Sequence, residues 1–142
     1  MNISVIVVTF NPEVDKLSNL LDLVLMDQVN IIIVDNNSMN NGEIKKLTKK
    51  SHLVDVHVID HNKGIAFAQN LGIKIAIDNN SEYVLFFDQD SSIDHNFINN
   101  LYSDFIDLKN KNIKLAAIGP RFIDEKKNFY FPALKLNHYN LI

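Results

Sequence analysis

Four short apolar runs, rich in β-branched residues, alternate with segments of helical periodicity, and this alternation constrains the fold more than any other feature of the chain. The runs span residues 3–10, 29–38, 54–60 and 82–90. All but the third are almost continuously apolar, which is typical of strands buried on both faces of a parallel sheet. We therefore predict an α/β fold, with a mostly parallel sheet and helices on both of its faces.

The segments between these runs have apolar residues at the spacing of an amphipathic helix. We expect helices within residues 12–26, 40–50, 64–79 and 95–110. A fifth strand is expected over 113–123, interrupted by the Gly-Pro pair near its end. The remaining residues have no clean period, so we expect the chain to stop partway through a larger domain.

The length and composition of the chain exclude several classes of protein. Its 142 residues are enough for one domain, and we treat 1–142 as a single domain. A net charge of −3 without a clustered basic face argues against a nucleic-acid partner. The absence of cysteine rules out disulfides and thiolate metal sites. No apolar run approaches the length of a membrane span and no signal peptide is present, so we expect a cytoplasmic protein without a transmembrane segment.

Polar residues follow each of the first four predicted strands. In chain order these strand-end residues are Thr9, Asn11 and Pro12, then Asp35, Asn36 and Asn37, then Asp60, His61, Asn62, Lys63 and Gly64, and finally Asp88, Gln89 and Asp90. In an open parallel sheet these ends share one edge, and ligands bind outside the carboxyl ends of the strands. Carboxylates gathered at that edge would repel one another unless a cation or a donor-rich ligand lay among them.

Asp88 and Asp90 are the strongest candidates for a metal site. They stand one residue apart, so their side chains can share a face or splay around one ion. Carboxylate oxygens suit Mg²⁺ or Mn²⁺, which leave coordination positions open for phosphate oxygens. The alternative is a structural one, because aspartates after strands often cap helices and make turns, and Ser91, Ser92 and Asp94 fit such a cap.

Asp35 and the Lys63-Gly64 pair allow two interpretations each. Asp35 could accept hydrogen bonds from a nucleobase or ribose, or it could form an ordinary turn. Lys63-Gly64 precedes a predicted helix, whose first N–H groups could meet a phosphate or merely begin the helix. The chain has no G-x-G-x-x-G motif after its first strand.

Taken in order, five segments resemble the family 2 glycosyltransferases, which have the GT-A fold. These segments are VIVVTFNP, IIIVDNNS, NKGIAFAQNLGI, VLFFDQDSS and AAIGPRF, and the resemblance covers essentially the whole chain. With glutamine between the aspartates, FFDQDSS looks most like the rhamnosyltransferase-type branch, whose donors are often dTDP-sugars. The resemblance implies a GT-A-like, Rossmann-like fold, truncated here, with this chain as its N-terminal nucleotide-sugar-binding part.

The resemblance also implies a function and roles for individual residues. The chain would transfer a sugar from a nucleotide-diphosphate donor, such as dTDP-rhamnose, to a saccharide or lipid-linked acceptor in cell-surface polysaccharide synthesis. Such an acceptor would allow peripheral contact with the inner face of the membrane. Mg²⁺ or Mn²⁺ would be held on the diphosphate by Asp90 together with Asp88. The residues implied in nucleotide binding are Thr9, Asn11, Asp35, Lys63, Gly64, Asn70 and Asp88.

The catalytic base is not identified within this chain. The acceptor hydroxyl must lose a proton as its oxygen attacks the anomeric carbon, so a positioned carboxylate is needed. The carboxylates after Asp94 fall on a predicted helix or in a charged turn, and we expect the base beyond Ile142. Two alternatives remain: a non-catalytic or truncated nucleotide-binding domain, and, with less support, a phosphatase of the haloacid dehalogenase type, which would want its D-x-D motif near the start of the chain.

Overall fold

The computed structural model describes residues 2–120, 123–124 and 129–130. The chain divides into two compact units, Met1–Ile98 and Asn99–Ile142. The first unit contains the central sheet and all the residues of the candidate site.

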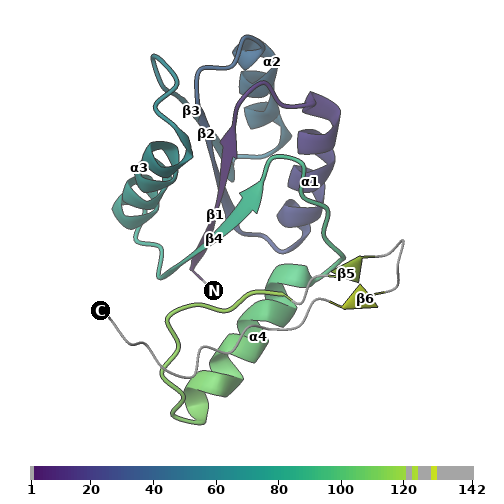
Figure 1. Cartoon of the computed structure of the whole chain (residues 1–142), viewed down its shortest axis with the longest axis vertical. Coiled ribbons are helices and arrows are strands. Elements are labelled where there is room, and N and C mark those ends of the chain that lie inside the picture. Colours follow the sequence, from purple (N-terminus) through teal and green to yellow (C-terminus); the bar gives the residue numbers. More distant parts are fainter. Residues whose placement is uncertain (1, 121–122, 125–128, 131–142) are drawn as a thin grey trace. The chain divides into compact units, whose positions relative to one another are not determined.

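A four-stranded, all-parallel sheet forms the centre of the first unit (Figure 1). Its strands are β1 (Ile3–Thr9), β2 (Asn30–Asp35), β3 (Val54–Val58) and β4 (Tyr83–Asp88). The order across the sheet is β3-β2-β1-β4, so the two most buried strands, β1 and β2, are the inner ones. This arrangement confirms the predicted α/β class, its parallel sheet and its flanking helices.

The register brings the carboxyl ends of the strands to one edge. Thr9 pairs with Asp35, and Asp35 pairs in turn with Val58. On the other side of β1, Val8 pairs with Asp88. The loops that follow β1, β2, β3 and β4 therefore leave the sheet at the same edge, as the sequence predicted.

The helices lie on both faces of the sheet (Figure 1). In Figure 1, α3 covers one face, and α1 and α2 lie on the other. Helix α4 begins in the first unit and continues into the second. The helices are α1 (Val14–Met26), α2 (Asn41–Lys46) with the 3₁₀ turn η1 (Leu47–Lys50), α3 (Ile65–Asp78) and α4 (Phe97–Asn110).

Helix α3 packs against β1 at a glycine, which permits a close contact. A Cβ built on Gly72 would lie 2.6 Å from Cγ2 of Ile6, a fully buried residue of β1. No side chain fits at that distance, so glycine permits the contact. The core on this face consists of Ile6, Ile32, Val34, Ala68 and Ala76.

The opposite face of the sheet has its own buried core. Strand residues alternate between faces, so Val5 and Val7 point away from α3. They are completely buried, as are the inward-facing residues of α1. The buried residues of α1 are Leu17, Leu20, Leu21 and Val24.

The second unit differs from the prediction. The expected strand over 113–123 is wrong for 113–120, which form no helix or strand, while residues 121 and 122 lie outside the described residues. Alanines at 116 and 117 have low strand propensity, and Pro120 has no N–H for a ladder. Two-residue strands β5 (Ile123–Asp124) and β6 (Phe129–Tyr130) instead pair antiparallel with each other.

Asparagine occupies most of the left-handed backbone positions in the described part of the chain. The non-glycine residues with positive φ are Asn11, Gln28, Asn37, Asn80, Asn96 and Asn112. Gly64, with φ of 84°, stands just before α3 as its N-cap. Asparagine tolerates this conformation better than most residues because its short amide can bond locally.

Candidate functional site

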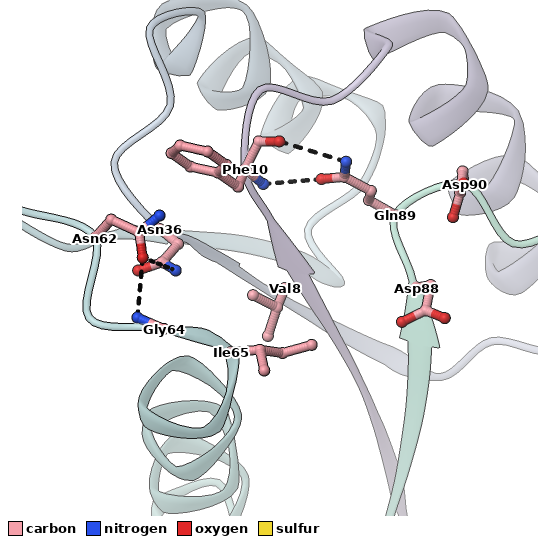
Figure 2. A pocket seen from close by; sticks show the side chains of 9 residues that line it. All are labelled: Val8, Phe10, Asn36, Asn62, Gly64, Ile65, Asp88, Gln89 and Asp90. Carbon is pink, nitrogen blue, oxygen red and sulfur yellow. Dashed lines mark hydrogen bonds between the residues drawn. The ribbon is translucent and has the colours of Figure 1, made fainter.

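An open cavity of about 490 Å³ lies at the carboxyl edge of the sheet (Figure 2). It is bounded by the end of β1, the segments after β2 and β4, and the start of α3. Its position is the one expected for a ligand site in an open parallel sheet. The lining residues are Val8, Phe10, Asn36, Asn62, Gly64, Ile65, Asp88, Gln89 and Asp90.

The cavity lies on the α3 side of the sheet. Val8 is two residues beyond Ile6, which packs against α3, so both side chains point to this side. Asp88 is the register partner of Val8 and shares its face. The carboxylate of Asp88 is therefore directed to the same side as the first turn of α3, where Gly64 and Ile65 line the cavity.

Asp88 and Asp90 are both exposed and both line the cavity. The structure thus brings together the two aspartates predicted to hold a metal. One of them, Asp90, acts electrostatically on Lys16 in the first turn of α1. The hydrogen bond and charge of Glu13 chiefly raise the pKa of Lys16, and the charge of Asp90 adds to the effect.

The side chain of Gln89, between the two aspartates, pairs with the backbone of Phe10 (Figure 2). The Phe10 N–H donates to Oε1 of Gln89 at 2.8 Å, and Nε2 of Gln89 donates to the Phe10 carbonyl at 3.4 Å. These contacts connect the segment after β4 to the segment after β1. Phe10 is 48% exposed and lines the cavity, so it offers the cavity a flat apolar surface.

Asn36 and Asn62 hold the loop before α3 (Figure 2). The Asn36 side chain donates to Oδ1 of Asn62 at 2.8 Å and accepts from the Lys63 N–H at 2.9 Å. The same Asn62 oxygen accepts from the Gly64 N–H at 2.9 Å. Asn36 is 4% exposed, and its own N–H donates to the Thr9 carbonyl at 2.7 Å. The start of α3 is thereby fixed against the ends of β1 and β2.

The ammonium group of Lys63 contacts Asp60 and the Phe67 ring, neither of which lines the cavity. Its Nζ lies 2.9 Å from Oδ1 of Asp60 and 4.9 Å from the centre of the Phe67 ring. The hydrogen bond from Lys63 is the main cause that holds the pKa of Asp60 below its usual value. Lys63 does not line the cavity, although Gly64 beside it does.

Thr9 and Asp35 are fully buried and bonded to each other. Asp35 accepts from Oγ1 of Thr9 at 2.9 Å and from the N–H and hydroxyl of Ser38. As Val34 packs against α3, Asp35 points to the opposite face. Asp35 and Asp88 therefore share an edge of the sheet but project from opposite faces, and a nucleotide contact for Thr9 or Asp35 stays a prediction.

Asn11 and Asn70 also lie away from the cavity lining. Asn11 has φ of 48°, and its side-chain oxygen accepts from the Met39 N–H at 2.8 Å. Asn70 is an exposed residue of α3. Of the residues predicted for the site, the cavity brings together Gly64, Asp88 and Asp90.

Four polar or aromatic lining residues were given no binding role from the sequence: Phe10, Asn36, Asn62 and Gln89, of which the last three were expected at the carboxyl edge of the sheet. Each stands one or two positions from a residue that was predicted. The signal was therefore present in the segments after the strands. The residue of each segment that faces the cavity is set by where the strand ends and by hydrogen bonds between side-chain amides and distant backbone groups. No local sequence pattern reveals these contacts.

The two aspartates fit a partial site for a hard cation. Within the described residues, no group of three or more histidine, cysteine, aspartate or glutamate side chains could hold a metal ion. Mg²⁺, however, is commonly bound through one or two carboxylates, with substrate phosphates and water as its other ligands. Asp88 and Asp90 supply such a pair at an open cavity, where water or the phosphates of a ligand would complete the coordination of a cation.

The fold and site define a parallel α/β domain with an acidic ligand cavity at the carboxyl edge of its sheet. Residues 4–137 match the family described as "Glycosyl transferase family 2". The chain belongs to this family. Membership confirms the resemblance drawn from the sequence and argues against the phosphatase alternative.

Two curated relatives agree with this assignment. The chain is 37% identical over 145 residues to dTDP-rhamnosyl transferase RfbF of Shigella flexneri, an alignment that covers 99% of this chain and 45% of RfbF. It is 38% identical over 104 residues to poly-beta-1,6-N-acetyl-D-glucosamine synthase of Staphylococcus epidermidis, which covers 73% of this chain and 24% of the synthase. The chain thus spans less than half the length of either relative.

None of the helices in the described part of the chain has the length and apolar character needed to span a membrane.

Proposed function

We propose that the chain is the N-terminal, nucleotide-sugar-binding part of a glycosyltransferase that transfers a sugar, with dTDP-rhamnose as the donor, to a saccharide or lipid-linked saccharide. The observation that carries this proposal is the cavity whose lining combines Asp88 and Asp90 with Gly64 and Ile65 at the start of α3. Similarity to the rhamnosyltransferase supports the choice of donor. Both relatives, by their names, make or transfer saccharides, which supports a role in polysaccharide synthesis.

In this proposal the diphosphate lies between the two aspartates and the start of α3. Asp88 and Asp90 hold Mg²⁺ or Mn²⁺, which neutralises the diphosphate as it leaves the sugar. On the other side of the diphosphate, the N–H groups at the beginning of α3 stabilise its negative charge. The exposed ring of Phe10 provides an apolar surface for the nucleobase. The aspartates thus orient the donor, and the ring and loops fix its other end.

The chain on its own acts as the donor-binding part. Besides Asp88 and Asp90, the cavity has no carboxylate in its lining within the described part of the chain, so neither a base nor an acceptor subsite is evident there. The alternative of a non-catalytic nucleotide-binding domain rests on the same observation. We place the protein in the cytoplasm, at the inner face of the membrane if the acceptor is lipid-linked, and its lack of cysteine fits a reducing compartment.

Calorimetry with dTDP and UDP, each with and without Mn²⁺, tests the proposal. We expect Mn²⁺-dependent binding that favours dTDP. Asp90→Asn should weaken that binding at least about tenfold, because it removes a charged ligand from the cation. A sugar-transfer assay with dTDP-rhamnose then separates turnover from binding alone.

Asp94→Asn is the matched control, because it makes the same charge change in the same segment without altering the cavity lining. Its affinity should equal that of the parent protein. Equal affinity for the parent and Asp90→Asn would remove the metal assignment, and absence of any nucleotide binding would contradict the proposed function itself.

A further inference from the structure

We infer that Gln89 is a positioning residue that links Phe10 to Asp88 and Asp90, so that cation binding at the aspartates is transmitted to the Phe10 side of the cavity. The inference rests on the proposed function, because it concerns the same cavity. It adds a role for the residue between the aspartates, whose side chain is turned toward protein backbone (Figure 2).

The ladder between β1 and β4 stops before the segment that contains Gln89. Its last register pair is Val8 with Asp88. Beyond it the backbone after β4 turns, and the Ser91 N–H donates to the Asp88 carbonyl at 3.0 Å. The backbone of this segment therefore cannot continue as a strand partner for β1.

The side chain of Gln89 takes over that partnership. Its amide oxygen accepts from the Phe10 N–H, and its amide nitrogen donates to the Phe10 carbonyl, at 2.8 and 3.4 Å. These are the two kinds of contact that a neighbouring strand would make through its own backbone. A two-point contact fixes the orientation of the amide as well as its distance.

Few side chains can make this contact. Glutamate has the same length but no donor for the Phe10 carbonyl, and methionine has neither donor nor acceptor of useful strength. Asparagine keeps the amide on a shorter chain. The glutamine thereby sets the backbone on either side of it, from which Asp88 and Asp90 project into the cavity lining.

Coupling across the cavity follows from this connection. A ligand that touches both the aspartates and the Phe10 ring must meet them in a fixed relation. If Gln89 holds the aspartates and Phe10 in their relative positions, a cation on the aspartates alters the hydrogen bond at the Phe10 N–H. Loss of the Gln89 amide then weakens ligand binding at the aspartates and at Phe10 together. Such a connection between two binding groups is a coupling between sites.

The test is a titration of the ¹⁵N-labelled protein with Mg²⁺ alone, followed by NMR. In the parent protein, the Phe10 amide resonance should shift together with those of Asp88 and Asp90. In Gln89→Met the apparent dissociation constant for Mg²⁺ should rise about five- to tenfold, the order expected for losing two modest hydrogen bonds. The Phe10 amide should then no longer respond. Gln89→Asn should behave like Gln89→Met, since its amide cannot reach.

Ser81→Ala is the control for a merely structural effect. Ser81 shares a 2.7 Å hydrogen bond with Ser4, just before β4 and at the opposite end of the same strand pair. Its removal should lower the thermal midpoint without changing Mg²⁺ affinity. Weakening of Mg²⁺ binding by Ser81→Ala to the extent seen with Gln89→Met would overturn the inference.

Two further outcomes separate this inference from the proposed function. Parent-like Mg²⁺ affinity and a parent-like Phe10 response in Gln89→Met, with binding lost in Asp90→Asn, would refute the role of Gln89 and leave the metal site intact. If Mg²⁺ shifts neither aspartate in the parent protein, the metal site and the role of Gln89 are both wrong.

Discussion

Asn36 connects three segments through one buried residue. Its backbone N–H bonds the end of β1, and its side chain bonds Asn62 and the N–H of Lys63 before α3. A buried amide with all these partners is difficult to replace, because any smaller group leaves donors or acceptors unpaired.

Asn36→Ala should destabilise the protein by about 1–3 kcal/mol, because two part-buried hydrogen bonds are lost, one to Asn62 and one from the Lys63 N–H. The measurement is urea unfolding together with hydrogen exchange of the Lys63 and Gly64 amides, which should accelerate more than amides of the β1–β2 ladder. The ladder amides serve as an internal control. Uniform acceleration across the chain would show that Asn36 contributes only general stability.

Single residues also show why the site was only partly predictable. Sequence alone located the segments after the strands, and two of its candidate residues, Asp88 and Asp90, line the cavity. It could not show that Asp35 points to the opposite face of the sheet, because one residue of register decides that. Nor could it show that Gln89 bonds the Phe10 backbone, since that contact joins residues 79 positions apart.

At the scale of elements, the distance between α3 and β1 depends on Gly72. Its missing side chain allows the helix to approach Ile6 more closely than any other residue would permit. This approach brings the beginning of α3 to the cavity, so the packing of the helix and the geometry of the site are connected.

Gly72→Ala should destabilise the protein by about 1–3 kcal/mol, since a methyl group would lie 2.6 Å from a fully buried side chain, and overpacking outweighs the gain in helix propensity. Gly42→Ala is the matched control, because Gly42 is also helical and has no atom within 4 Å of the added carbon. It should be neutral or slightly stabilising. Thermal unfolding measures both, and an equal midpoint for the two variants would contradict the close packing of α3.

The elements of the first unit were predictable because each apolar run had one consistent interpretation. Periodicity placed all four strands and the helices between them, with differences of a few residues at their ends. The segment 113–120 was mispredicted because its aliphatic content resembles that of a strand. A strand also needs hydrogen bonds to a neighbouring strand, and Pro120 has no N–H to donate, while the alanines have low strand propensity. Apolar composition alone does not supply those partners.

At the scale of the whole molecule, the sheet order concentrates stability in β1 and β2. Both are inner strands with neighbours on each side, and most of their residues are buried. β3 and β4 are the outer strands of this sheet in the described part of the chain, and their side chains are more exposed.

Native-state hydrogen exchange should therefore be slowest for amides of β1 and β2, faster for β4, and fastest for 111–120. The reason is that amides in the buried centre of a sheet exchange only through large unfolding events. Exchange measured by mass spectrometry on peptides from each segment provides the check. Protection of 111–120 equal to that of β1 would contradict this distribution of stability.

The left-handed asparagines have a consequence for how the loops could change during evolution or engineering. Glycine at these positions would keep the backbone conformation but would leave the unfolded chain more freedom to lose on folding. Alanine would be strained, and at Asn11 either replacement would also deprive the Met39 N–H of its acceptor. Few substitutions are therefore expected to be tolerated at these asparagines. Libraries that diversify the loops should keep them constant and vary their exposed neighbours.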